Sequence, residues 1–248
     1  MSYLPPLADG GAGARRRPDR RWSADGTWER ILRAVQADAD AEGRIDWSMV
    51  SVDSTTCHAH QHAASASTRA PKIPSRRRSP ARHRPDEAPG RSRGGLTSKI
   101  HLAGECGCRP LGFVITPGQW GDAPQMIPVS WKRSVCPGRL VDDRTRPDHV
   151  GGDKAYSSRR NRRHLRRRQI KHTIPEPRDQ RANRRRRGSQ GGQPAGFDKT
   201  IYRRRNEVER TINRLKNIRA VATRFDKRAY VFHGTVTVAA IRLWLRPE

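Results

Sequence analysis

Two acidic residues stand where they could bind a divalent metal ion. Asp53 closes a short apolar run over residues 47–52, and Asp153 closes the shorter run 150–152. Both runs are predicted strands, and ligands of open α/β sheets bind outside the carboxyl ends of strands. If the two strands are neighbours, the carboxylates converge, and they repel each other unless a cation such as Mg²⁺ lies between them. Each Asp could equally be an ordinary strand end or helix cap.

A third acid comes from a helix predicted over residues 200–218. With Tyr202 at 0° and each residue advancing by about 100°, Arg205, Glu209 and Lys216 fall at about 300°, 340° and 320°. The four side chains therefore form one polar stripe about 60° wide. The apolar face lies directly beside this stripe and consists of Ile201, Val208, Ile212 and Leu215.

The same geometry selects Glu209 rather than Glu207, which falls at about 140° on the other side of the helix. A helix packed on its apolar face would hold Glu209 at the edge of the core, aimed along the surface of the sheet. The alternative is a surface ion pair between Arg205 and Glu209, which are four residues apart on a basic helix. Periodicity does not distinguish these two interpretations.

Hydrophobic patterning predicts the elements that must position these acids. Strands are predicted at 45–53, 97–103, 110–116, 150–153 and 170–174, the second and third joined as a hairpin. Helices are predicted at 27–41, 123–131, 158–168, 200–218 and 228–245. A hairpin that leads into strand–helix–strand units predicts an α/β fold with a mixed sheet flanked by helices.

The remaining segments divide the chain. Residues 1–21 mix Pro, Gly and Arg without periodicity and are predicted to be disordered, and residues 22–44 form a short helical segment. Residues 45–248 form the main domain, in which residues 63–95 and 176–198 are predicted basic loops.

The charge of the chain predicts a polyanionic partner. Lys and Arg number 52 against 24 Asp and Glu, a net charge of +28, so binding should weaken as salt rises. A solvated basic surface is the alternative for part of this excess. Four cysteines without CxxC spacing and without a signal peptide indicate a cytoplasmic protein, and no apolar run is long enough for a membrane span.

Three motifs make the sequence recognisable. The spacing Tyr202-x2-Arg205-x3-Glu209-x6-Lys216 resembles the signature of bacterial insertion-sequence transposases of the type four and type five groups. The segments 52–55 and 152–156 resemble the first and second aspartate motifs of that family. The runs 94–102 and 220–227 are also similar, and the resemblance covers about residues 22–246.

The resemblance implies a ribonuclease H-like fold, a five-stranded mixed sheet flanked by helices. It implies that Asp53, Asp153 and Glu209 are the catalytic residues and ligands of two Mg²⁺ ions, for which Mn²⁺ can substitute. Two such ions activate the attacking oxygen and stabilise the leaving one. The implied reactions are cleavage of DNA by water and strand transfer by the freed 3′-hydroxyl.

The implied partners are double-stranded DNA, as element ends and target, and a second copy of the chain in a homodimer on DNA. Tyr202, Arg205 and Lys216 are expected to contact DNA phosphate near the scissile bond, and Lys154 is a further candidate. Residues 1–19 do not resemble the family. We therefore expect an N-terminally truncated chain with impaired recognition of terminal repeats. The alternatives are a stand-alone nuclease on the same fold and an inactive remnant that only binds nucleic acid.

Other residues could bind metal but have simpler interpretations. His58, His60 and His62 alternate after Asp53, as on a solvent-facing strand or loop. The neighbouring Cys57 fits a small core residue better than a ligand. Asp122 either supports the acidic site or caps a helix that starts at Ala123. The arginine runs at 76–78, 166–168 and 184–187 fit contacts to the DNA backbone or solvation rather than base recognition.

Overall fold

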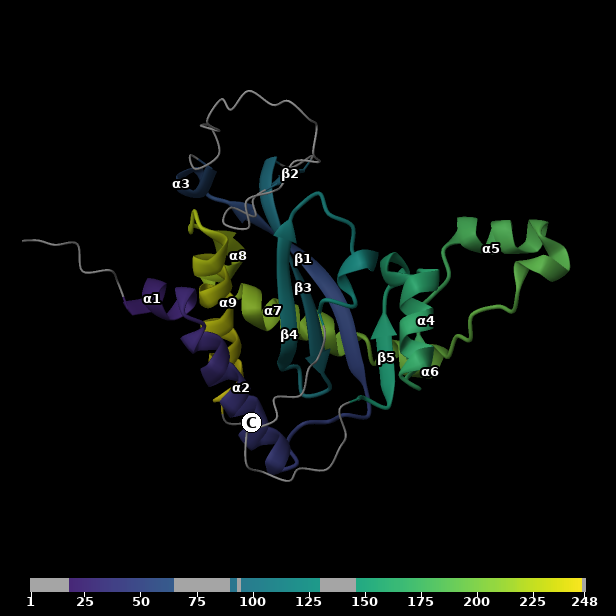
Figure 1. The fold of residues 1–248 in the computed structure, drawn as a ribbon, viewed down its shortest axis with the longest axis horizontal. Coiled ribbons are helices and arrows are strands. Elements are labelled where there is room, and N and C mark those ends of the chain that lie inside the picture. Colours follow the sequence, from purple (N-terminus) through teal and green to yellow (C-terminus); the bar gives the residue numbers. More distant parts are fainter. Residues whose placement is uncertain (1–17, 65–89, 93–94, 130–145, 247–248) are drawn as a thin grey trace, which may run out of the picture.

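A mixed sheet forms the centre of the molecule. The computed structural model describes residues 18–64, 90–92, 95–129 and 146–246 (Figure 1). Within these residues the sheet has seven strands: β1 (Val50–Ala59), β2 (Gly90–Ser92), β3 (Gly95–Glu105), β4 (Pro110–Pro117), β5 (His149–Gly152), β6 (Lys171–Thr173) and β7 (Thr223–Arg224).

The central strand β1 has neighbours of both directions. It pairs antiparallel with β3, which continues into the β4 hairpin, and parallel with β5, which pairs parallel with β6. The predicted mixed α/β architecture is therefore confirmed. The sheet exceeds the expected five strands because β2 pairs with the start of β3 and β7 pairs with the end of β1.

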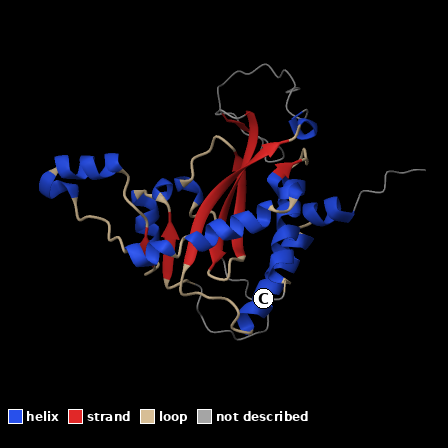
Figure 2. Ribbon diagram, turned by 180° about the vertical axis from the view of Figure 1, so that it is seen from behind, coloured by secondary structure: helices blue, strands red, loops and turns tan. Residues whose placement is uncertain are grey.

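Helices cover the sheet and extend beyond it. They are α1 (Pro18–Ala24), α2 (Thr27–Ala41), α3 (Gln61–Ala64), α4 (Arg159–Arg167), α5 (Arg178–Arg186), α6 (Lys199–Arg203), α7 (Asn206–Lys216), α8 (Arg219–Ala222) and α9 (Ala229–Trp244). In Figure 2, α7 crosses the face of the sheet. In Figure 1, α2 and α9 lie at one side, and α4 and α5 lie beyond β5 at the other.

Apolar side chains join these layers. One cluster packs α7 and α9 on the sheet through Ile100, Leu102, Val208 and Phe232. The other cluster includes Val50, Val52, Val150 and Leu165, which join β1, β5 and α4. Full burial of one such side chain contributes about 1.5–3 kcal/mol, so these contacts fix α4 beside β1 and β5 and fix α7 on the adjacent strand β3.

The strand predicted to end at Asp53 is longer and begins later. Residues 45–49 lie outside the sheet, and β1 runs from Val50 to Ala59, which places Asp53 inside it. The polar residues after Asp53 stay in the strand because β3 pairs with them as far as His58. The apolar run alone could not show that extension.

The helix predicted over 200–218 is divided into α6 and α7. At the junction the amides of Arg204 and Arg205 donate to the carbonyls three residues earlier, at 3.1 Å each, as in a 3₁₀ turn. Both arginine side chains reach acids outside the helix: Arg204 approaches Asp46, and Arg205 pairs with Asp53. The step of 100° per residue therefore does not apply across this junction, whereas it does apply from Glu209 to Lys216 within α7.

Three other element predictions are corrected. The predicted loop 176–198 contains α5, which has no apolar face and so gave no helical signal. The helix predicted at 123–131 is a short 3₁₀ turn, Ala123–Gln125, and residues 130–131 lie outside the described part. Residues 18–21, predicted to be disordered, belong to α1, and of the predicted loop 63–95 residues 65–89 and 93–94 lie outside the description.

The other predicted helices and the hairpin are confirmed. α2, α4 and α9 begin and end within one or two residues of their predicted bounds, and β3 and β4 pair through seven residues of register. Within the described residues, no helix combines the length and the apolar character that crossing a bilayer requires.

Candidate active site

Two of the predicted acids lie side by side at the end of a parallel ladder. The β1–β5 pairing ends at Val52 and Gly152, so Asp53 and Asp153 are the next residue on each strand. Neighbouring strands are about 4.8 Å apart, so the backbone register brings the two acids together. The expectation that these strands are neighbours is confirmed. What differs is that β1 continues past Asp53, whereas β5 ends before Asp153.

Glu209 reaches the same region from α7. Val208 and Ile212 of α7 are buried against the sheet. This packing leaves Glu209 at the edge of the contact, with its carboxylate 2.8 Å from the Arg205 guanidinium. The other nitrogen of that guanidinium lies 3.1 Å from the Asp53 carboxylate. Arg205 thus joins an acid of β1 to an acid of α7, and the predicted Arg205–Glu209 pair is not a separate surface feature.

The neighbouring Glu207 lies elsewhere, as predicted. Its carboxylate is 4.0 Å from Arg204, which also lies 3.4 Å from Asp46. Arg204 donates to Ser48 Oγ at 2.9 Å as well, so this group ties α7 to the segment before β1. Glu209 is therefore the acid of α7 that shares a counterion with Asp53.

Burial and charge both act on Asp53. Its carboxylate accepts a hydrogen bond from the Ser54 amide at 2.8 Å and one from Arg205 at 3.1 Å. Burial raises the pKa of Asp53 above its usual value despite these two bonds, and the charges of Asp153 and Glu209 raise it further. Asp153 and Glu209 thus lie close enough to Asp53 to raise its pKa, and a cation would stabilise such a group of three carboxylates.

Asp153 is anchored by its own backbone. Its carboxylate accepts a hydrogen bond from the Ala155 amide at 2.8 Å and so caps the 3₁₀ turn Lys154–Tyr156. Ser158 then caps α4 in the same way, through the Asn161 amide at 3.1 Å. The capping interpretation of Asp153 is thus correct. One carboxylate oxygen makes the capping bond, which leaves the other able to bind a cation.

The donor set suits a hard divalent cation. All three acids offer oxygen, which Mg²⁺ and Mn²⁺ prefer over nitrogen or sulfur. Among the described residues, no three His, Cys, Asp or Glu side chains lie as close as a shared metal ion requires. The Arg205 guanidinium lies between the carboxylates of Asp53 and Glu209 and supplies their positive charge. Binding of a metal ion by both acids therefore requires Arg205 to move.

The other predicted DNA-contacting residues are dispersed around the acids. The Tyr202 ring packs on Phe197 with centroids 5.1 Å apart and lies 5.8 Å from the Arg205 guanidinium. Lys216, the last residue of α7, reaches β1 beyond Asp53, where its ammonium is 3.3 Å from Thr55 Oγ1. Lys154 is exposed in the turn after Asp153. The structure thus places Tyr202 beside Arg205, whereas Lys216 follows Glu209 by seven residues, about two turns of α7.

Asp122 belongs to a polar group that patterning did not identify. Its side chain does not cap the turn Ala123–Gln125. Instead it accepts hydrogen bonds from Ser54 Oγ at 2.8 Å and Lys99 Nζ at 3.1 Å, and it lies 3.5 Å from His101 Nδ1. The alternation of polar residues along 97–101 was the signal that could have identified this group. It supports β1 directly after Asp53.

The histidines after Asp53 form no metal-binding cluster within the part of the chain that the structure describes. His58 is exposed on β1, and the His60 ring packs on Phe225 with centroids 4.8 Å apart. Cys57 is fully buried in the core, and burial raises the pKa of its thiol to about 11. The solvent-facing interpretation holds for His58, and the core interpretation holds for Cys57. Asp142, Asp143 and Cys136 lie outside the described residues.

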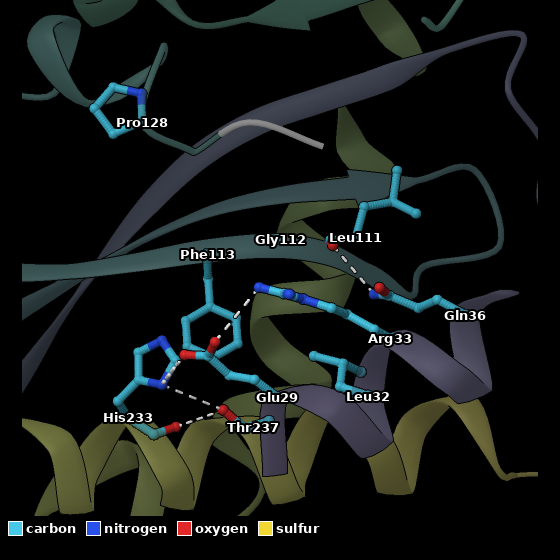
Figure 3. A pocket seen from close by; sticks show the side chains of 10 residues that line it. All are labelled: Glu29, Leu32, Arg33, Gln36, Leu111, Gly112, Phe113, Pro128, His233 and Thr237. Atoms are coloured by element: carbon cyan, nitrogen blue, oxygen red, sulfur yellow. Dashed lines mark hydrogen bonds and ion pairs between the residues drawn. The ribbon is translucent and has the colours of Figure 1, made fainter. Parts of the chain in front are cut away.

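Apart from the acidic site, a pocket lies between α2, α9 and β4 (Figure 3). Its volume is about 290 Å³, and it contains Glu29, His233 and Thr237. The carboxylate of Glu29, at 3.6 Å, and the hydroxyl of Thr237, at 3.5 Å, both approach the same nitrogen, Nδ1 of His233. A proton relay needs partners on opposite ring nitrogens. These residues therefore link α2 to α9, and the acidic site is the better candidate for chemistry.

Comparisons with known proteins identify the family of the chain. The family described as "Transposase DDE domain" matches residues 47–244, which include Asp53, Asp153 and Glu209. A Brucella ovis protein named "Putative transposase for insertion sequence element IS6501" is 28% identical over 151 residues, which are 61% of this chain and all of that protein.

One solved structure is also similar. The "Crystal structure of the Mos1 mariner paired end complex with Mn" matches with a TM-score of 0.27 and 11% identity over 98% of this chain. The match spans 65% of that chain, slightly less than two thirds of its length.

Proposed function

Because the chain belongs to the family of transposase DDE domains, we propose that it cleaves DNA at the ends of an insertion sequence and joins them to target DNA. The observation that carries this proposal is the parallel β1–β5 register, which sets Asp53 beside Asp153 and within the charge field of Glu209. The chemistry of the family uses divalent metal ions, and we propose Mg²⁺, with Mn²⁺ as a substitute.

Asp53, Asp153 and Glu209 would hold the ions. When bound, two divalent ions activate the attacking oxygen and neutralise charge on the leaving oxygen of an in-line displacement at phosphorus. The charges of both Asp153 and Glu209 act on Asp53, so it would contribute to both sites. Phosphoryl transfer depends on position and charge, which these fixed elements supply.

Arg205 is placed to serve two states of the site. Without DNA it neutralises Asp53 and Glu209. When a cation replaces it there, its guanidinium can turn toward a DNA phosphate, where planar, bidentate donors bind well. Tyr202, within 5.8 Å, supports the guanidinium from one side. We propose Arg205 and Tyr202 as contacts to DNA near the scissile bond, with Lys154 and Lys216 at its flanks.

Cleavage of DNA that carries the inverted repeats next to the gene tests the proposal. We expect Mg²⁺- or Mn²⁺-dependent nicking by the chain, and its loss in Glu209→Gln and Asp153→Ala. Glu207→Gln is the matched control, because Glu207 lies on the same helix but pairs with Arg204. Metal-independent nicking, or equal loss in the control, would contradict the assignment.

Two further outcomes separate the rival functions. Nicking without joining, when pre-cut ends are supplied together with target DNA, indicates a stand-alone nuclease. Binding of DNA that Asp153→Ala leaves unchanged, without any nicking, indicates a remnant that only binds nucleic acid. The expected homodimer on DNA stays a prediction, and sedimentation of the protein with and without one element end tests it.

A further inference from the structure

The helix α4 carries a basic face. With Arg159 at 0°, the exposed arginines of this helix fall within an arc of about 120°, while Asn161 and Leu165 fall opposite and are buried. The basic face consists of Arg159, Arg160, Arg163, Arg166 and Arg167. Among the described residues, these five guanidinium groups make no hydrogen bond or ion pair. Their charge is therefore available to a partner.

The helix α5 carries arginines around more than half of its circumference and has no buried face. No residue of α5 is buried, and Ala182 is its single apolar residue. Arg178, Arg181 and Arg185 fall within about 60° of one another, at spacings that bring like charges close and destabilise a helix. A helix without an apolar face needs other support. An anion along these three arginines would supply it.

Two contacts fix α5 to the molecule at one end. Gln180 donates to the Ser157 carbonyl at 2.9 Å and accepts from the Ser157 hydroxyl at 2.9 Å. Arg184 pairs with Glu176 at 3.0 Å. The rest of α5 extends away from the sheet beyond α4 (Figures 1 and 2). Its base is thus set at Ser157, immediately before the residue that caps α4.

Both helices start next to the acidic site. Ser157 follows Asp153 by four residues, and α4 begins two residues after Ser157. The turn between them is held by the Asp153 cap and by Arg162, which donates to Ser157 Oγ at 3.0 Å and to the Ile174 carbonyl at 2.9 Å. A strand of phosphates on the basic face of α4 therefore passes close to Asp153.

We propose that α4 and α5 together bind the phosphate backbone of duplex DNA and hold it beside the acids. This inference rests on the proposed function for its choice of DNA. The basic face of α4 extends over about 13 Å of helix, and duplex DNA carries one charge per about 1.7 Å of its axis. The contacts are to phosphate, so they position the duplex and do not select its sequence.

Salt-dependent binding tests the surface. The full chain is titrated, in EDTA, into a fluorescent 40-base-pair duplex of arbitrary sequence at several salt concentrations. The α4 variant is Arg159→Ala with Arg163→Ala and Arg166→Ala. The α5 variant is Arg178→Ala with Arg181→Ala and Arg185→Ala. The control removes the same charge at the other side of the molecule: Arg33→Ala with Arg242→Ala and Arg246→Ala.

Each phosphate contact contributes about 0.9 to the slope of log K against log salt. We expect the α4 variant and the α5 variant each to lose about 2–3 from that slope and to bind DNA at least tenfold more weakly, while the control keeps the wild-type slope. Wild-type slopes in both the α4 variant and the α5 variant, or an equal loss in the control, overturn the proposal. Tighter binding of duplex RNA of the same length overturns the assignment to DNA.

Two measurements keep these outcomes separate from other failures. Circular dichroism shows whether each variant is folded. If the α4 variant is unfolded, the α5 variant alone tests the proposal, since no residue of α5 is buried. DNA binding that depends on the arginines of α4 and α5, without any cleavage, contradicts the proposed reaction alone. Cleavage together with unchanged DNA binding in the α4 and α5 variants contradicts the proposed binding surface alone.

Discussion

The guanidinium of Arg205 lies within hydrogen-bond distance of two carboxylates from different elements, Asp53 of β1 and Glu209 of α7. Its own pKa is raised by these two acids even though burial opposes this. The charge of both acids is therefore balanced by one side chain, and a metal ion held as we propose would compete with it for the same oxygens. This competition makes a residue predicted to touch DNA important for the protein without DNA.

Replacing Arg205 by Ala should destabilise the metal-free protein by about 1–3 kcal/mol, because a buried Asp53 loses its counterion while Asp153 and Glu209 remain. Addition of Mn²⁺ should then raise the melting temperature of this variant more than that of the wild type. Differential scanning fluorimetry with and without Mn²⁺ measures both effects. Arg203→Ala, an exposed neighbour, is the control, and an equal response to Mn²⁺ in wild type and Arg205→Ala would refute the competition.

His101 should make stability depend on pH. Burial lowers its pKa to about 4, and its Nε2 lies 2.9 Å from Thr116 Oγ1. The unfolded chain takes up this proton near the usual value of about 6.5, so stability present above that pH is lost as the pH falls toward 4. The loss attributable to His101 is at most about 3 kcal/mol.

Urea unfolding between these two pH values tests the prediction, with His101→Gln as the comparison. The Gln variant keeps a polar partner for Thr116 but cannot titrate, so its stability should fall less over the same range. Parallel curves for the two proteins would show that folding does not lower the pKa of His101.

At the residue scale, the acids themselves were predictable. Asp53 and Asp153 follow apolar runs, and the spacing from Tyr202 to Lys216 is a local pattern. Arg205 could not be assigned to Asp53, because that contact joins residues that are distant in sequence and meet only in the folded chain. The contacts of Asp122 with Ser54 and Lys99 were missed for the same reason.

The helix α7 sits on β3 where the strand has no side chain. A Cβ atom at Gly104 would lie 3.1 Å from Thr211 Oγ1 and 3.6 Å from a methyl group of Val208. These two residues belong to the buried face of α7. The close approach at Gly104 therefore sets the height of α7 above the sheet and with it the position of Glu209.

Gly104→Val should displace α7 and cost about 1–3 kcal/mol, as overpacking of a buried contact generally does. Gly104→Ala adds only the one tight contact with Thr211, so its cost should be smaller. Metal-dependent nicking should fall with the size of the side chain, because Glu209 moves with the helix. Gly196→Val is the control, since nothing lies near its Cβ. Full nicking by a folded Gly104→Val protein would show that the activity does not depend on how closely α7 approaches β3 at Gly104.

At the scale of elements, patterning predicted those that bury a face. The helices α2, α4 and α9 and the β3–β4 hairpin each pack apolar residues on the core, which imposes a period on the sequence. α5 has no such face, so no period could reveal it. The arginines at the break between α6 and α7 pair with acids distant in the sequence, and β1 beyond Asp53 pairs with β3, so both features involve segments that are far apart along the chain.

At the scale of the whole molecule, chemistry and charge occupy different segments. The acids come from β1, the end of β5 and α7, whereas the arginines of α4 and α5 lie between the second acid and the third in the sequence. In Figure 1 these two helices stand at the side of the sheet opposite α2 and α9. A net charge of +28 predicts affinity for DNA, but only this distribution says where the duplex should lie.

The parallel pairing of Val52 with Gly152 joins residues a hundred positions apart, and β1 pairs with β7 across a still longer span. Contacts between such distant segments are slow to form, because much of the chain must be ordered before they close. Local helices such as α4 form far sooner. If the proposed roles hold, we expect a chain that is still folding to bind DNA through its arginines before its three acids meet, and so to hold DNA before it can cut it.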